Sequence, residues 1–307
     1  MPKAIAFTEY GPADVLHPVD TDQPQPGPGQ VRIAVRTAGV NPIDCKIRSG
    51  AMQQAYPVEF PSVPGREAAG VVDALGEGVT ELLDGDEVLG PTLTGAYAES
   101  ALADANSLVI RPGSLSWEEA AAIPVAARTS YRILDMLNLH PGQTILLHGA
   151  AGGVGTVAVQ FARARGLRVI GTASAANHDY LRSLGAVPVE YGDGLTERVR
   201  AAAPEGVDGV LDLAGKGNVL PLSVELTGSA DRVVTIADPL AEQYGVRFSG
   251  GEGEIDQTRR ALTAALSLQT AGTLQVPVHR TYPLAEAAEA HRESEQGHLA
   301  GKIVLTV

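Results

Sequence analysis

The stretch Gln143–Gly166, QTILLHGAAGGVGTVAVQFARARG, decides the fold, because an aliphatic run is followed at once by a turn crowded with glycine. The run TILLHG predicts a buried strand, and four of the seven residues 149–155 are glycine. The apolar residues after the turn recur at helical spacing: Val154, Val157, Ala158 and Phe161. The sequence therefore predicts a strand, a tight turn and a helix in direct succession.

The small residues of this turn match a ligand-binding pattern. Ala150, Gly152 and Gly155 form an A-x-G-x-x-G version of the dinucleotide-binding motif. Such residues allow the turn, let backbone N–H groups approach a pyrophosphate, and let the helix pack on the strand. A turn that needs glycine only for packing is the alternative, but the strand before it and the helix after it are the context that the motif requires. We expect a pyrophosphate at the N-terminus of the helix, where the helix dipole favours negative charge.

Strands and helices alternate beyond this stretch. The expected strands are 167–173, 187–191, 207–215 and 231–237, and the expected helices are around 178–186, 195–203 and 256–268. This alternation implies βαβ units and a parallel sheet. Upstream, Ser116 and Glu119 form a capping box, which predicts that a helix begins there. The segment 215–228, GKGNVLPLSVELTG, is assigned to no element.

Residues 1–112 instead resemble short strands separated by turn residues. QVRIAVRTAGV alternates so that Val31, Ile33 and Val35 point inward, and residues 67–91 contain two more strands around glycine-rich turns. The chain ends in two further expected strands, 276–282 and 301–307. We interpret residues 1–112 as a small β-barrel.

Composition limits the possible classes of protein. The chain has 307 residues, which predicts two domains at about 150 residues each. Its longest apolar runs fall short of the roughly 20 residues of a membrane-spanning helix, and its N-terminus lacks the order of a signal peptide. We expect a cytoplasmic protein. The formal charge of −13 argues against nucleic acid or an anionic membrane as the main partner.

The cysteine and histidine residues show no metal-binding pattern. The single cysteine, Cys45, excludes an internal disulfide and a cysteine-rich zinc site. We expect it to be a packed side chain, although the neighbouring Lys46 could lower its pKa. The seven histidines lack ligand spacing, and His291 and His298, in or near a C-terminal helix, are expected to be solvated.

The end of the second strand of the alternating region bears on which dinucleotide binds. NAD enzymes place an acidic residue there for the adenine ribose, whereas this chain has Ala173 and Ser174. A 2′-phosphate would not be repelled, and possible donors follow: Asn177, His178 and Arg182. A solvated helix face is the alternative for these three, and NADPH is favoured over NADH.

Several stretches, in order along nearly the whole chain, carry a resemblance: AGVNPIDCKIRSG, VPGREAAGVV, GAYAES, EEAAAIPVAARTSYRIL, HGAAGGVG and PLAEAAEAHRESEQGHLAGKIVLTV. The chain resembles the zinc-independent medium-chain dehydrogenases/reductases of the quinone oxidoreductase (zeta-crystallin-like) family. This resemblance implies an α/β fold with a GroES-like β-barrel domain, residues 1–113 and 274–307, and a Rossmann doubly wound parallel sheet, residues 114–273. It also implies an active site in the cleft between the domains.

The resemblance sharpens the question of zinc. Zinc alcohol dehydrogenases of this superfamily have a cysteine ligand where this chain has Asn41, and a histidine ligand where it has Arg66. A guanidinium cannot ligate Zn²⁺, and the cysteine-rich structural-zinc lobe is missing. A zinc alcohol dehydrogenase is therefore disfavoured. Without a Lewis acid, hydride would go from NADP(H) to an electron-poor acceptor, a quinone or an α,β-unsaturated carbonyl.

The resemblance also implies the site residues. As catalytic residues we expect Asn41, Lys46 and Arg66, the two cations facing a substrate oxygen. The expected cofactor-binding residues are Asn41, Thr129, Ala150, Gly152, Gly153, Val154, Gly155, Ser174, Tyr191, Ala214, Ile236 and Lys302. The chain departs from several relatives, which have a tyrosine at the position of Lys46 and a lysine around Asn177 or His178.

Two functions remain open at this point. The first is an NADPH-dependent reductase of quinones or enones. The second is a protein that binds NADPH without turnover, as a redox sensor or structural component. By analogy we expect a homodimer joined through the strands near 231–237 and GVRFSG, with a small-molecule substrate.

Overall fold

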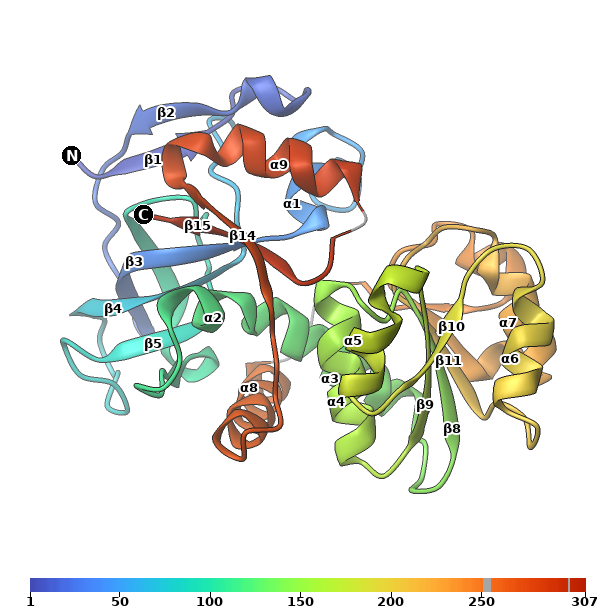
Figure 1. Ribbon diagram of the computed structural model, residues 1–307. Helices are drawn as coiled ribbons and strands as arrows, with labels where there is room; N and C mark the ends of the chain where they lie inside the picture. Colours follow the sequence, from blue (N-terminus) through green and yellow to red (C-terminus); the bar gives the residue numbers. More distant parts are fainter. Residues whose placement is uncertain (251–254, 298) are drawn as a thin grey trace. The chain divides into compact units, whose positions relative to one another are not determined.

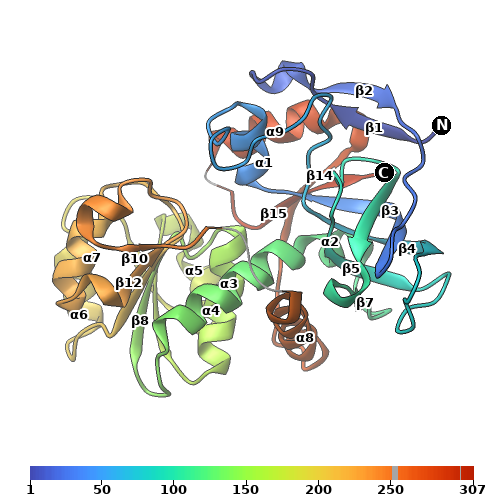
Figure 2. The same cartoon turned by 180° about the vertical axis from the view of Figure 1, so that it is seen from behind.

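The computed structural model describes residues 1–250, 255–297 and 299–307, and it divides into two compact units (Figures 1 and 2). Unit 1 comprises Met1–Val125, Thr258–Leu266 and Val276–Val307, and unit 2 comprises Ala126–Gln257 and Ser267–Gln275. Unit 1 thus contains both ends of the chain. No helix in the described part of the chain is long and apolar enough to cross a bilayer.

Unit 1 is built on a seven-stranded sheet that joins both ends of the chain. Its strands are β3 (Gln30–Val40), β4 (Glu67–Leu75), β5 (Glu87–Pro91), β6 (Ser100–Asp104), β7 (Val109–Ile110), β14 (Val278–Pro283) and β15 (Lys302–Thr306). The order is β14-β15-β3-β4-β5-β7, with β6 also paired to β3. Along β3, residues Gln30–Ala34 pair with β6 and Thr37–Val40 pair with β15, so the last strand of the chain completes the sheet (Figure 1). A separate hairpin pairs β1 (Lys3–Ala6) with β2 (His17–Asp20).

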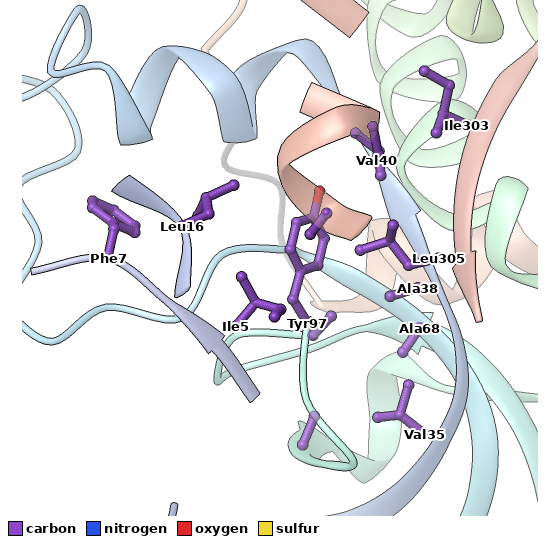
Figure 3. Close-up of a cluster of buried hydrophobic side chains, with 14 residues drawn as sticks. Ile5, Phe7, Leu16, Val35, Ala38, Val40, Ala68, Tyr97, Ile303 and Leu305 are labelled. Atoms are coloured by element: carbon purple, nitrogen blue, oxygen red, sulfur yellow. The ribbon is translucent and has the colours of Figure 1, made fainter. Parts of the chain in front are cut away.

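The alternating pattern of β3 was predicted correctly. Val31 and Ile33 are completely buried and Val35 is 5% exposed. Val35 belongs to a core cluster in which β3, β4 and β15 meet Phe7 and Tyr97 (Figure 3). The helices of unit 1 are α1 (Pro42–Arg48), α2 (Trp117–Ala122) and α9 (Ala287–Gln296), together with the middle of α8 (Ile255–Thr270) and the start of α3 (Pro124–Leu137).

The capping box at the start of α2 is confirmed. Ser116 Oγ accepts from the backbone N–H of Glu119 at 3.2 Å, and Glu119 Oε2 accepts from the N–H of Ser116 at 2.9 Å. These two bonds satisfy donors that the first turn of a helix leaves unpaired.

Unit 2 contains the predicted parallel sheet. Its elements are β8 (Thr144–His148), α4 (Gly153–Ala164), β9 (Arg168–Ala173), α5 (His178–Ser183), β10 (Val187–Glu190), α6 (Leu195–Ala202), β11 (Gly209–Asp212), α7 (Val219–Thr227), β12 (Val233–Thr235) and β13 (Arg247–Phe248). The order is β10-β9-β8-β11-β12-β13 and every pair is parallel. Helices cover both faces, α4 and α5 on one and α6 and α7 on the other (Figure 1). This is the doubly wound order: the chain adds strands toward β10 from one side of β8 and toward β13 from the other, so the strand order reverses between β8 and β11, where such sheets bind ligands.

Helix α7 lies in the segment for which the sequence offered no pattern. Pro221 stands in its first turn, where backbone N–H groups have no partner within the helix, so the missing N–H costs nothing there. The helix begins after Asn218, whose φ is 50°, and ends at Gly228, whose φ is 71°. Val219 and Leu220 pack into the core below the sheet. Helix α7 was therefore not predicted, because a proline normally marks the end of a helix and Pro221 lies at its start.

Candidate functional site

The glycine-rich turn lies between β8 and α4, at the carboxyl end of the sheet. Gly149 has a φ of +74°, and a Cβ there would lie 3.2 Å from the Cβ of Ala214, which follows β11. A Cβ at Gly155 would lie 2.3 Å from the carbonyl oxygen of Gly149, so the first turn of α4 needs glycine to pack on the strand end. Glycine at 149 and 155 is therefore explained by the fold alone.

Gly152 is different, because the fold does not require it. Its φ of −72° is accessible to any residue, and a Cβ there would meet only the Gly149 oxygen, at an ordinary 3.5 Å. Gly152 is also the N-cap of the twelve-residue helix α4. A missing side chain at the positive end of a helix fits a pyrophosphate that approaches the backbone closely.

His148 supports the turn from below. It is 1% exposed, its Nε2 lies 3.1 Å from Ser223 Oγ, and its Nδ1 lies 3.4 Å from Thr172 Oγ1. Because Ser223 Oγ donates to the Val219 carbonyl, it accepts from His148, which assigns the proton to Nε2. Burial lowers the pKa of His148 to about 4, so the ring is neutral at pH 7.

Asp212 connects the ends of two strands that sequence reasoning did not link. It is completely buried, and its Oδ1 accepts from the N–H groups of Ala214 and Gly215 at 3.0 Å each. Its Oδ2 accepts from Thr235 Oγ1 at 2.8 Å, and its backbone oxygen accepts from the N–H of Ile236. One side chain thus fixes the loops that hold Ala214 and Ile236. An aspartate at the end of an apolar strand is the signal that could have identified it.

The other predicted cofactor residues of unit 2 follow the same edge of the sheet. Ser174 comes directly after β9 and accepts from Asn177 Nδ2 at 3.2 Å, and Tyr191 comes after β10 and is 48% exposed. Thr129 lies in α3 and is 8% exposed, next to Ser130, whose Oγ donates to the Val154 carbonyl. Because all strands are parallel, residues after β8, β9, β10, β11 and β12 gather at one edge, whereas Thr129 lies on α3, the helix that bonds to the start of α4 through Ser130.

Unit 1 contains a second cluster, centred on a carboxylate. Glu67 is completely buried, and its Oε1 accepts from Lys302 Nζ at 2.7 Å and from Asn41 Nδ2 at 2.8 Å. Its Oε2 accepts from the backbone N–H of Val125 at 2.6 Å. Lys302 Nζ also donates to Asn41 Oδ1 at 2.6 Å. The structure therefore brings together Asn41 and Lys302, and it adds Glu67, which was not predicted although it stands beside Arg66 in the GRE segment.

A chain of buried polar groups continues behind Asn41. Asp44 Oδ2 accepts from the Asn41 N–H at 2.9 Å and from Tyr97 OH at 3.3 Å, and Tyr97 OH lies 3.1 Å from His291 Nε2. Desolvation raises the pKa of Asp44 to about 6, and burial lowers that of His291 to about 3, with a smaller contribution from the positive charge of Arg48. The expectation that His291 is solvated was wrong, because the helix turns this residue toward Tyr97. His298 lies outside the described residues.

The predicted cations of unit 1 are more accessible than this cluster. Lys46 is exposed on α1, and the Arg66 guanidinium lies 5.3 Å from the centre of the Tyr56 ring. Cys45 is buried, and desolvation raises the pKa of its thiol to about 12, which confirms a packed side chain. Within residues 1–250, 255–297 and 299–307, no three histidine, cysteine or carboxylate side chains are grouped to hold a metal ion.

Comparison with known proteins places the chain in a family. An alcohol dehydrogenase GroES-like domain matches residues 27–114, and a zinc-binding dehydrogenase domain matches residues 184–305. The quinone oxidoreductase of Lama guanicoe is 32% identical, with 99% of this chain and 97% of that protein covered. The synaptic vesicle membrane protein VAT-1 homolog of Rattus norvegicus is also 32% identical, with 92% of this chain and 78% of that protein covered.

Solved structures agree with the sequence comparison. Escherichia coli quinone oxidoreductase complexed with NADPH matches with a TM-score of 0.86 at 27% identity, and 99% of this chain and all of that chain are covered. The predicted combination of a GroES-like domain and a doubly wound parallel sheet is thereby confirmed. With similarity over nearly the full length of both sequences, the chain belongs to the quinone oxidoreductase family of the medium-chain dehydrogenases/reductases.

Proposed function

We propose that this protein is an NADPH-dependent, zinc-independent reductase that transfers hydride to quinones or α,β-unsaturated carbonyl compounds. The observation that carries the proposal is Gly152, where neither the backbone nor the packing requires glycine, so the missing side chain serves a bound pyrophosphate. The family relationship and the NADPH complex of the E. coli relative support the same assignment. Ser174, in place of a carboxylate after β9, favours NADPH over NADH.

NADPH supplies the hydride when it is bound. In unit 2 we assign its pyrophosphate to the backbone of residues 150–155 and its other contacts to Thr129, Ser174, Tyr191, Ala214 and Ile236. In unit 1 we assign Asn41, Lys46 and Arg66 to the acceptor. The acceptor oxygen gains negative charge as hydride arrives, and amide and cationic N–H donors stabilise that charge. Arg66 stands where zinc-dependent relatives have a histidine ligand. Its guanidinium would stabilise the acceptor oxygen by positive charge and N–H donation in place of a metal ion.

We also propose a homodimer and a functional division of the chain at 113/114 and 273/274. The strand β13 is an edge of the parallel sheet, and Phe248 on it is 48% exposed. An open edge with an exposed aromatic residue is suited to pairing with a second copy.

The test is NADPH and NADH oxidation at 340 nm by the purified protein, with an ortho-quinone, a para-quinone and a simple enone offered in parallel. We expect turnover with NADPH, unchanged after dialysis against a chelator. Tight NADPH binding without reduction of any acceptor would replace the reductase with a sensor or binding protein. Stoichiometric bound zinc, lost together with activity on chelation, would contradict the zinc-independent chemistry.

A further inference from the structure

The buried pair of Glu67 and Lys302 has no part in the assignment above beyond a cofactor contact predicted for Lys302. Glu67 is 0% exposed and Lys302 is 5% exposed, and Asn41, at 4%, bonds to both. Replacing a buried ion pair by apolar residues of similar size is often neutral or stabilising, so stability alone is a weak reason for having one.

We propose that Glu67 and Lys302 form a positioning pair that fixes the side-chain amide of Asn41 for the reaction. The proposal rests on the proposed function and adds a role for two residues that act through a third. An ammonium group only donates hydrogen bonds, so the Asn41 atom 2.6 Å from Lys302 Nζ is the carbonyl oxygen. An ionised carboxylate only accepts, so the atom 2.8 Å from Glu67 Oε1 is the amide nitrogen. The two charges together exclude the flipped amide.

The carboxylate itself is held without freedom to move. A Cβ at Gly39 would lie 2.3 Å from Glu67 Oε1 and 2.7 Å from the Ala121 carbonyl oxygen, so Glu67 fills the space that glycine leaves on β3. Val125 N–H holds the other oxygen at 2.6 Å. The backbone of Asn41 is anchored separately, because its N–H donates to Asp44 Oδ2 at 2.9 Å.

A fixed amide has a chemical use. One Nδ2 hydrogen of Asn41 bonds to Glu67, and the other has no acceptor among the residues that the structure describes. Its direction is set by the first bond, because the NH₂ group is planar. We assign this N–H group to donate a hydrogen bond to the oxygen of the quinone or enone that receives the hydride, because negative charge develops on that oxygen.

The decisive variant is E67Q/K302M, which removes both charges of this buried pair and allows either orientation of the amide. Each single change leaves the other member of the pair buried without its partner, so K302M is expected to lower Tm. The double variant is expected to recover at least half of that loss. The double variant should still have a kcat between about 10- and 100-fold below wild type. The exposed pair Arg168–Glu205 provides the control, and R168M/E205Q should change neither value.

A readout independent of turnover is the side-chain amide resonance of Asn41, assigned by its loss in N41S. We expect two well-separated hydrogen shifts in wild type and in K302R, and their convergence in E67Q and in E67Q/K302M. A double variant with wild-type kcat, or with both shifts unchanged, would overturn the positioning role. If wild type reduces no acceptor, the proposed function fails, and the resonance still decides whether the pair orients Asn41.

Discussion

The Gly149 carbonyl oxygen lies where a Cβ at Gly155 would approach it to 2.3 Å, so α4 packs on the end of β8 only through glycine. Gly152, three residues earlier, has 3.5 Å of room and an ordinary φ. Within one motif, close packing therefore requires glycine at position 155, whereas neither packing nor backbone conformation requires it at position 152.

This difference predicts that one alanine substitution lowers the stability of the protein and that the other weakens NADPH binding. G155A should destabilise the protein by about 2 kcal/mol or more, because backbone atoms must move to admit a methyl group. G152A should change the free energy of unfolding by less than about 0.5 kcal/mol, yet raise the Kd for NADPH about tenfold or more. Denaturant unfolding and NADPH fluorescence titration measure the two quantities. Equal NADPH affinity of G152A and wild type would contradict the assignment of the pyrophosphate to this turn.

Asp212 is expected to affect cofactor affinity through the loops that it holds. D212N cannot accept from Thr235 Oγ1 as the carboxylate does, so the loops with Ala214 and Ile236 should loosen and the Kd for NADPH should rise severalfold.

Asp208 offers a matched control at the other end of the same sheet. Its Oδ2 accepts from the Thr144 N–H at 2.8 Å. D208N should cost a similar free energy of unfolding, about 1 kcal/mol, without changing the Kd for NADPH. If D208N weakens NADPH binding as much as D212N does, the effect is general loss of stability and not loop position.

His148 should make the protein sensitive to acid. Burial lowers its pKa from 6.5 to about 4, because the folded state favours the neutral ring. The contribution of the neutral ring to the free energy of unfolding is therefore complete above pH 6.5 and is lost as pH falls toward 4. Between pH 7 and pH 4.5 the free energy of unfolding of wild type should fall by about 2 to 3 kcal/mol more than that of H148Q. Urea denaturation at both pH values tests this, with the exposed His140 as control in H140Q. Parallel pH profiles of wild type and H148Q would contradict a neutral buried ring.

Asp44 should act in the opposite direction. Desolvation raises its pKa from 3.8 to about 6, so the carboxyl stabilises the fold when protonated and this contribution is lost as pH rises from 4 through 6. Relative to wild type, D44N should gain about 2 to 3 kcal/mol between pH 4 and pH 7. The free energy of unfolding measured across this range shows the gain, and D84N, at an exposed position, should show none. A constant difference between D44N and wild type would mean that Asp44 is ionised at no extra cost.

Much of the fold could be predicted because its signals are local. The motif Ala150, Gly152, Gly155 follows a five-residue buried strand, and the alternation after it specifies a parallel sheet. Helix α7 was missed because Pro221 is read as a helix breaker unless its place in the first turn is known. His291 was misjudged because a helix face can be assigned to solvent or core only when its neighbours are known, and here Tyr97 is the neighbour.

The sequence by itself determined the glycine turn and the alternation of strands and helices, because these depend on residues within a few positions of one another, and it determined the family through stretches of matching residues along nearly the whole chain. Only the tertiary structure decided the surroundings of Asn41, since Glu67 and Lys302 are 26 and 261 residues away from it in the chain. Likewise, the hydrogen bond between Asp212 and Thr235 exists because parallel strands end at one edge of the sheet. Contacts of this kind arise from strand order and burial, and no local spacing of residue types encodes them.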